Sequence, residues 1–465
     1  MTKLIQIQQV MRNKLKIVVI ILVLAILPIG CLVGPKYKKP EDQNATNFRN
    51  GAANIDTLAS VVNVKWFDLF NDDVLKGLIN KGLANNYDMR IAMARIERSR
   101  AELGYTKADL LPVIGYGAKV NSNEKAFPVS NASASLSWEL DFWGKIRHEN
   151  RAVQNELLAS EEGRKVILSN LVSDIAVSYF QLRDFDNRLV IAAKTLESRQ
   201  KGYDIINQRF KSGYVSEVDL VQIEQQVAIA EATIPAIKRQ ITVLENKISI
   251  LIGQAPTPIE RGKTNSELQI ATTIPVSIPS ILLKNRPDVN QAERLYMASN
   301  ERIGVAQAMR FPSFNIAALA GFANSSVSNL FDGSSYLQNA SAGVTGPIFN
   351  FGKNKRRVEI YRQMAEESRL SYQKTCITAV AEVEQALQNV RTYKEEWTAR
   401  NRQVIAARKN LELSNARYYN GYVSYLEVID IERSLFDAEL KLSELAQNQL
   451  SSTIELYRAL GGGWN

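Results

Sequence analysis

The chain has 465 residues, and its 57 Lys and Arg and 48 Asp and Glu give a formal net charge of +9. Because both signs are spread along the sequence, this balance does not indicate a nucleic-acid-binding protein. Two cysteines, Cys31 and Cys376, are too few for a disulfide scaffold or a cysteine-based zinc site, and we expect neither a metal nor another cofactor.

The chain opens with the pattern of a secretory signal peptide over residues 1–30. Basic residues precede an apolar run over 17–29, which is the order that export signals show. Cys31 follows Gly30 at the place where a bacterial lipoprotein is cleaved and acylated. We predict lipidation of Cys31; the alternative is an ordinary signal peptide with an incidental cysteine. No later apolar run suits a transmembrane helix, so a membrane span would consist of strands.

Two windows alternate between apolar and polar side chains, which predicts strands with one apolar and one wet face. The alternation runs over 114–120, 132–142, 314–322 and 340–348. The second window also holds a longer, serine-rich loop over 324–335. Strands of about ten residues, bounded by aromatic side chains such as Trp138 and Phe351, suit a transmembrane β-barrel.

Four strands are too few to close a membrane barrel, for which about eight are the practical minimum. We therefore expect the chain to oligomerise, and three copies would supply twelve strands. The alternative is a soluble four-stranded sheet buried against helices, because alternation is a weak signal in any one segment.

A long helix is predicted after each strand window. Residues 353–420 contain neither Gly nor Pro, and residues 145–212 contain no Pro and only Gly163 and Gly202. An uninterrupted helix of this size would span roughly 100 Å, far more than the helices of a globular core. Apolar residues of the later helix fall on one face, namely Val380, Val383, Ala386, Leu387 and Val390. This spacing predicts coiled-coil-like packing, with polar residues on the remaining surface.

The chain is an internal duplication. The phrases GYVSEVDLVQIE and GYVSYLEVIDIE begin at Gly213 and Gly421, 208 residues apart. Upstream the offset is 200, as between Pro112 and Pro312, so the second copy holds an insertion between Pro312 and Phe351. Each copy is therefore one complete supersecondary unit that occurs twice.

Several different short sequence motifs are spread along essentially the whole mature chain. They are residues 31–37 with Pro40, Trp66-Phe67 with Phe70, Asp72 and Leu75, Leu110-Leu111-Pro112, residues 135–144, Arg286-Pro287-Asp288-Val289, Phe311-Pro312, Gly346-Pro347, Arg417-Tyr418, residues 421–430 and residues 456–464. Together these motifs resemble the outer-membrane factors of the TolC type, in their lipoprotein (NodT-like) branch.

The resemblance implies a membrane α+β fold. In such a homotrimer a 12-stranded β-barrel, with four strands per chain, is continuous with a long periplasmic α-helical barrel. The implied function is the exit duct of a tripartite efflux or type I secretion-like system, which conducts substrates passively to the exterior. The implied partners are two further copies, a periplasmic adaptor protein, an inner-membrane pump and outer-membrane lipid. The protein would be lipid-anchored in the cell outer membrane and extend into the periplasm.

Patterns and resemblance together divide the chain into nine segments. These are a lipoprotein signal peptide (1–30), an N-terminal tail and equatorial segment (31–65), helices of repeat 1 (66–112), barrel strands 1 and 2 (113–142), long periplasmic helices of repeat 1 (143–252), a Pro-rich equatorial linker (253–285), a helix of repeat 2 (286–312), barrel strands 3 and 4 (313–350), and the long periplasmic helices of repeat 2 with the C-terminal tail (351–465).

Two helix–helix turns are the most informative places for function. Gly213 and Gly421 suit the left-handed conformation that ends a helix. Three residues later each copy carries a predicted capping box, Ser216 with Asp219 and Ser424 with Glu427.

In the family that the chain resembles, these turns form the periplasmic mouth, where the adaptor docks and acidic residues line the closed constriction. The resemblance places gate carboxylates at Asp430, Glu427 and Asp219, although Glu427 has the alternative role of capping its helix. Gln222 stands at the position equivalent to Asp430, so the two tips differ. The predicted adaptor-docking residues are Arg209, Gly213, Tyr214, Val215, Ser216, Gly421, Tyr422, Val423 and Ser424.

Other classes of function fit the sequence less well. The only histidine, His148, is expected at the surface, and no nucleotide-binding or hydrolase motif occurs, so we expect no enzyme. A periplasmic adaptor also carries a lipidated cysteine and a helical hairpin but lacks membrane strands, and a structural envelope spacer would not conduct. The basic run over 352–357 suits anionic headgroups at the membrane rim better than nucleic acid. Pumps for drugs, metals, dyes and peptides share this architecture, so the sequence indicates no particular substrate.

Overall fold

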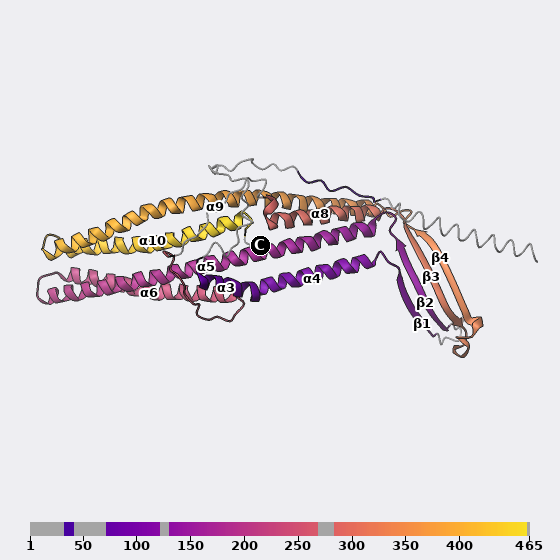
Figure 1. Cartoon of the computed structure of the whole chain (residues 1–465), viewed down its shortest axis with the longest axis horizontal. Coiled ribbons are helices and arrows are strands. Elements are labelled where there is room, and N and C mark those ends of the chain that lie inside the picture. The colour runs from indigo at the N-terminus through magenta and orange to yellow at the C-terminus, as the bar shows by residue number, and fades with distance from the viewer. Residues whose placement is uncertain (1–31, 41–70, 121–129, 268–282, 463–465) are drawn as a thin grey trace, which may run out of the picture. The chain divides into compact units, whose positions relative to one another are not determined.

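The structure is a computed structural model that describes residues 32–40, 71–120, 130–267 and 283–462 (Figure 1). The first copy of the duplication forms α3 (Asp73–Asn85), α4 (Tyr87–Ala108), β1 (Val113–Lys119), β2 (Ser130–Leu140), α5 (Lys145–Lys211) and α6 (Glu217–Leu251). The second copy forms α8 (Pro287–Ala308), β3 (Ser313–Asn324), β4 (Tyr336–Thr345), α9 (Lys353–Tyr419) and α10 (Tyr425–Ala459), with two short 3-10 turns between its strands, Val327–Asn329 and Gly333–Ser335. The predicted signal peptide over 1–30, Cys31 and most of the predicted tail over 31–65 lie outside the described residues.

The chain forms two compact units, and each draws on both copies of the duplication. The first is built from residues 1–41, 95–161 and 291–374, and the second from residues 42–94, 162–290 and 375–465. The first unit contains the four strands, and the second contains α3, α6 and α10. Helices α4, α5, α8 and α9 contribute residues to both units.

In the first unit the strands form one antiparallel sheet in the order β1-β2-β3-β4. The register places Leu136 of β2 opposite Ile114 of β1 and Ala318 of β3, so alternate residues of neighbouring strands share a face. This sheet confirms the four strands per chain that the alternation predicts. Its edges are β1 and β4, which pair on one side only.

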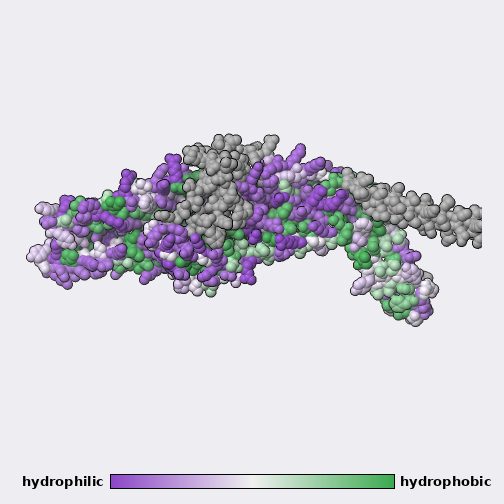
Figure 2. Space-filling view, in the orientation of Figure 1, coloured by the Kyte–Doolittle hydropathy of each residue, from purple (hydrophilic) through white to green (hydrophobic). Residues whose placement is uncertain are grey.

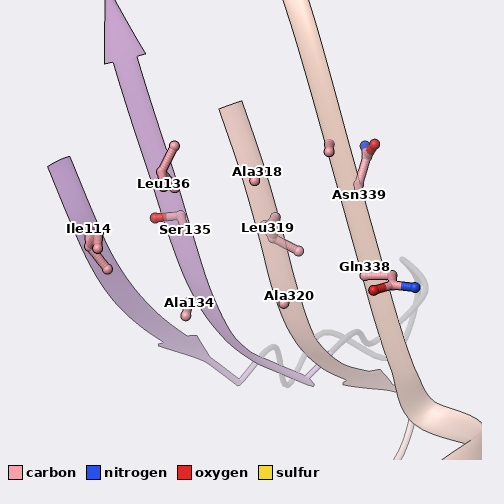
Figure 3. A pocket seen from close by; sticks show the side chains of 10 residues that line it. Ile114, Ala134, Ser135, Leu136, Ala318, Leu319, Ala320, Gln338 and Asn339 are labelled. Atoms are coloured by element: carbon pink, nitrogen blue, oxygen red, sulfur yellow. The ribbon is translucent and has the colours of Figure 1, made fainter. Parts of the chain in front are cut away.

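A shallow groove of about 390 Å³ crosses the sheet, lined by residues from all four strands (Figure 3). Its lining combines small side chains such as Ala134 and Ala318 with the larger Ile114 and Leu136. The groove follows from the alanine-rich sequence of β3, because alanine fills little volume above a sheet.

The strands differ from the predicted ones at their ends. β2 ends at Leu140 although the alternation continues to Phe142. The reason is the Asp141 carboxylate, which accepts hydrogen bonds from the amides of Ile146 and Arg147 at 3.0 and 2.9 Å and so turns the chain into α5. The other shifts are smaller: β1 stops at Lys119 rather than Val120, β3 extends to Asn324, and β4 covers Tyr336–Thr345 rather than 340–348.

The main core of the second unit lies where six helices meet. Its buried side chains come from α3, α4, α5, α6, α9 and α10, and they include Ile79, Ile175 and Ile248, which are fully buried. The apolar face predicted for the later long helix belongs to this core, because Val383 and Ala386 are buried and the other three residues pack against the cluster. That prediction is confirmed.

Hydrophilic side chains cover much of the helical surface, whereas the sheet presents a mixture of hydrophobic and pale residues (Figure 2). None of the described helices carries an apolar stretch of the length that a membrane crossing requires.

Residues 32–40 are held within the first unit by hydrogen bonds at separate points. The Val33 amide donates to the Trp143 carbonyl at 3.3 Å. Further along, Asn300 Nδ2 donates to the Pro35 carbonyl at 3.2 Å. This segment directly follows the predicted lipidation site in the sequence.

His148 is buried in the first unit, so the expectation of a surface histidine is wrong. Its Nδ1 lies 2.6 Å from Oε2 of Glu301, and the side chain is 3 % exposed. A side chain at either Gly34 or Gly304 would collide with the imidazole, so the two glycines provide the space that it fills. The sequence around His148 does not reveal such a pocket, because its walls come from three separate segments of the chain.

Candidate functional site at the helix tips

Both helix–helix turns lie in the second unit, one between α5 and α6 and the other between α9 and α10 (Figure 1). Each turns at a glycine with positive φ, 76° at Gly213 and 77° at Gly421. The amide of the following residue donates to the carbonyl five residues earlier, at 2.9 Å in the first turn and 3.0 Å in the second. These are the hydrogen bonds of a Schellman motif, in which glycine avoids the steric cost of positive φ. The predicted glycine caps are therefore present at both tips.

The first tip carries the predicted capping box. Ser216 Oγ accepts a hydrogen bond from the Asp219 amide at 3.3 Å, and the Asp219 carboxylate accepts from the Ser216 amide at 3.1 Å and hydroxyl at 2.8 Å. The Asp219 carboxylate thus caps the N-terminus of α6.

The capping box predicted at the second tip is absent. Ser424 has the extended backbone of an N-cap, but its side chain makes no cap hydrogen bond. The Glu427 carboxylate instead accepts from Ser414 Oγ and Arg417 Nη1 of α9, both at 3.1 Å. Glu427 favours these contacts over a capping box because a charged donor binds a carboxylate more strongly than a neutral amide does. The first copy lacks one of the two donors, since Ile206 stands at the position equivalent to Ser414.

Asp430, the other predicted gate carboxylate, lies on α10 one turn beyond Glu427. Its Oδ1 is 3.3 Å from Nη2 of Arg433, and both side chains are more than half exposed. Each of the two predicted gate acids on α10 therefore has a basic partner within the chain, Arg433 for Asp430 and Arg417 for Glu427. Exposed ion pairs of this kind are weak and screened by salt, so they leave both carboxylates able to attract a further cation.

An apolar cluster joins the two tips. Its buried members come from four helices and are Ile206, Ile223, Tyr418, Tyr425, Val428 and Ile429. Val215 and Val423 of the turns pack against this cluster, whereas Tyr214 and Tyr422 are exposed. Of the residues predicted to dock an adaptor, the valines hold the tips together and the tyrosines are accessible to another protein.

Polar and backbone contacts strengthen the connection between the tips. Arg209 Nη1 donates to the Tyr418 hydroxyl at 2.8 Å, and its guanidinium lies 4.8 Å from the centre of the Tyr418 ring. At Gly202 in the C-terminal part of α5, a side chain would collide with the Tyr425 hydroxyl of α10. The Arg209 guanidinium, predicted as a docking group, is thus bound within the chain.

The sequence patterns do not identify Arg199 of α5, which is buried in the structure. Arg199 donates from Nη1 to the Gln226 carbonyl at 2.8 Å, and its guanidinium lies 5.3 Å from the ring centre of Phe436. Burial lowers the pKa of Arg199 and raises the pKa of Glu432 on α10. The signal that could have revealed Arg199 is its position seven residues before Ile206, which places both on the buried face of α5.

Nearly the whole chain matches known proteins of one kind. Residues 78–254 and 278–462 match the sequence model of a family described as outer membrane efflux protein. The chain is 29% identical over 444 residues to the cation efflux system protein CusC of Escherichia coli, covering 94% of this chain and 96% of that protein. It is 30% identical over 454 residues to the solvent efflux pump outer membrane protein SrpC of Pseudomonas putida, with the same two coverages. A crystal structure of CusC from work on its folding and transmembrane channel formation has 30% identity and a TM-score of 0.84, covering 93% of this chain and all of that one.

The chain shares its fold, with a four-stranded sheet and two helices of 67 residues, with the solved structure of CusC along 93% of its length. The chain belongs to the outer membrane efflux protein family. It is an outer-membrane component of an efflux system, and the family is one of channels rather than of enzymes.

Alanine substitution at the two equivalent serines should affect the tips differently. Ser216→Ala removes the capping box, costs about 1 kcal/mol locally and should speed amide exchange in the first turn of α6 roughly fivefold. Ser424→Ala removes no cap hydrogen bond and should leave the first turn of α10 nearly unchanged. Hydrogen–deuterium exchange over 217–220 and 425–428 measures both effects. Equal losses of protection at the two sites would contradict the observed asymmetry.

Proposed function

We propose that the chain is one subunit of a homotrimeric duct that conducts substrates passively from an inner-membrane pump and a periplasmic adaptor to the cell exterior. The observation that carries this proposal is the four-stranded sheet with free edges at β1 and β4, in a chain whose fold follows that of CusC along 93% of its length. Backbone groups cannot stay unpaired in lipid, and four strands are too few to close on themselves. Three copies would supply a barrel of twelve strands, with the long helices extending into the periplasm.

The alternatives, a periplasmic adaptor or a structural envelope spacer, explain less of the molecule. Neither needs a sheet whose two edges are free for further strands. The match to the outer membrane efflux protein family along 78–254 and 278–462 also supports the duct.

The proposed gate consists of Asp430, Glu427 and Asp219 from each subunit. All three lie within the first two turns of α6 or α10, next to the glycine turns. In a trimer these carboxylates would surround one axis, and a ring of negative charge attracts and retains cations. We assign the leading role to Asp430, because Asp219 is engaged in a capping box and Glu427 is bound by two side chains of α9.

The adaptor is proposed to dock at the same tips. Tyr214 and Tyr422 offer large exposed side chains there. Val215, Val423 and Arg209 would support this surface from within, because each contacts the apolar cluster or Tyr418.

The two named relatives differ in cargo, since CusC belongs to a cation efflux system and SrpC to a solvent efflux pump. The chain is about equally similar to both, so the shared fold does not by itself select the cargo. We therefore propose a conducting path and no particular substrate.

Single-channel recording in planar bilayers tests the duct and its gate. Asp430→Asn should weaken the block by a trivalent cation added on the periplasmic side and reduce the preference for cations, because the ring loses charge. Glu427→Gln should change the block less, since Arg417 and Ser414 already bind that carboxylate. Gln222→Asp is the matched control at the equivalent position of the first tip and should strengthen the block. An unchanged block in Asp430→Asn would return Asp430 to the role of a solvated helix residue, and a wild-type protein that never conducts would overturn the duct.

Adjacent residues of β2 should respond oppositely to an added charge. Leu136 lies on the apolar face and Ser137 on the other, so Leu136→Arg should cost about 2 to 4 kcal/mol near the membrane midplane and Ser137→Arg far less. Folding yields into lipid vesicles compare the two variants. Indistinguishable yields would mean that this sheet does not face lipid on its apolar side.

We also propose that Cys31 carries the lipid anchor, on the basis of the signal peptide pattern that precedes it. Cys31→Ser should abolish metabolic labelling with palmitate. The trimer should still assemble, because the strands alone can hold the barrel in the membrane. Equal labelling of the wild type and the variant would exclude this anchor.

A further inference from the structure

The duplication extends to individual contacts within the first unit. Hydroxyls of Ser99 and Ser160 join α4 to α5 at 3.3 Å, and those of the equivalent Ser299 and Ser368 join α8 to α9 at 2.8 Å. The strand registers agree as well, with Ile114 opposite Leu136 in the first copy and Phe314 opposite Val344 in the second. Residues related by an offset of 200 before the strand hairpin, or 208 after it, therefore occupy equivalent places.

Within the chain the two copies meet at what we call the inner joint. It lies between β2 and the start of α5 on one side, and the end of α8 and β3 on the other. Trp143 stacks on Phe311 with ring centres 4.5 Å apart. Nine residues before Phe311, Arg302 of α8 pairs with Glu156 at 2.7 Å and lies 3.9 Å from Glu149.

The equivalent residues on the outer elements of the first unit are exposed. Phe351 corresponds to Trp143 and is 89 % exposed, while Leu111 corresponds to Phe311 and is 65 % exposed. Phe311 itself is 40 % exposed, so the contrast is sharper at two further positions. Ile360 is exposed whereas its equivalent Ala152 is buried, and Tyr105 is exposed whereas its equivalent Val305 is buried. The start of α9 and the end of α4 thus present the two halves of a joint that a single chain cannot complete.

One charged contact of the inner joint, Arg302 with Glu149, has a counterpart of reversed sign on these outer elements, whereas Met364 stands at the position equivalent to Glu156. Glu102 on α4 stands where α8 has Arg302, and Arg357 on α9 stands where α5 has Glu149. Among the described residues Glu102 forms no ion pair, and the Arg357 guanidinium reaches only Met309 Sδ at 3.3 Å and Asn354 Oδ1 at 3.4 Å. The two charges are therefore complementary to each other, and within the described part of the chain neither has an oppositely charged partner.

We infer that a second copy of the chain completes this arrangement as an outer joint, equivalent residue by residue to the inner one. Phe351 of one subunit packs against Leu111 of the next, Arg357 pairs with Glu102, and β4 pairs antiparallel with β1. The equivalent of the Leu136–Ala318 pair sets the register, with Val344 opposite Ala118. This inference rests on the proposed homo-oligomer and specifies how its subunits recognise each other.

The reversed charges also determine which surfaces of two copies can pair. If the face of α4 in one copy replaced α8 at the inner joint of another, Glu102 would oppose Glu149. Like charges placed opposite each other in an interface are costly and suppress the wrong pairing. Inner and outer joints are thus chemically distinct although their backbones are equivalent.

Cysteine crosslinking tests the contact in the full-length protein in membranes. In a Cys376→Ala background, Leu111→Cys combined with Phe351→Cys should yield linked species up to three chains with a short bis-maleimide. Either variant alone should yield none. The matched control, Trp143→Cys with Phe311→Cys, should link within one chain and yield no species that contains more than one chain.

Charge reversal tests the pairing itself. Glu102→Arg and Arg357→Glu should each lower the yield of the detergent-stable oligomer about tenfold, and the double variant should recover most of it. A chain that forms a conducting trimer, with no Leu111–Phe351 crosslink and no effect of single reversals, would overturn the outer joint and leave the duct intact. A linked ring of another number would refute the trimer but retain the joint, and a conducting monomer would refute both.

Discussion

The backbone groups along the free edges of β1 and β4 are the constraint on which the rest of the structure depends. In hydrocarbon these N–H and C=O groups have no water to bind, so only another strand can satisfy them. The alternation of apolar and polar side chains and the exposed aromatic residue Phe351 at the start of α9 are consistent with a sheet that is incomplete in one chain. In the proposed assembly they would belong to an interface with a second copy, which would explain why the exposed apolar residues are tolerated.

The duplication shows how one backbone arrangement accepts different chemistry. In the first copy Thr106 donates to Asn150 at 2.9 Å, whereas the equivalent positions of the second copy hold buried Ala306 and Val358. A satisfied polar pair and an apolar pair are both stable solutions for a closed helix contact, because neither leaves a buried group unpaired.

The sequence was sufficient for features that depend on local spacing. The strands, the long helices and the turns at Gly213 and Gly421 follow from alternation, from the absence of Gly and Pro, and from the need for positive φ. The features that it did not reveal depend on partners distant in the chain. Glu427 has the spacing of a capping box but is bound by Arg417, which approaches from α9.

The buried polar residues illustrate the same limit. His148 and Arg199 look like members of solvated helix faces, since charged residues surround both in the sequence. His148 is enclosed because two glycines leave space for it, and Arg199 because the carbonyl of Gln226 and the ring of Phe436 surround its guanidinium. Neither environment has a signature within one helix, so only the packed structure reveals it.

The connection between the two helix tips has a mechanical consequence. The apolar cluster, the Arg209–Tyr418 hydrogen bond and the close approach at Gly202 all tie the α5–α6 hairpin to the α9–α10 hairpin. To slide one hairpin past the other would expose this cluster to water and break the bond together with the packing. The two hairpins are therefore expected to move together, and in the proposed duct each subunit would contribute one moving part to the mouth rather than two. A partner bound to either tip of that duct would displace both, so contact with half of the duplicated surface would be enough to widen the opening.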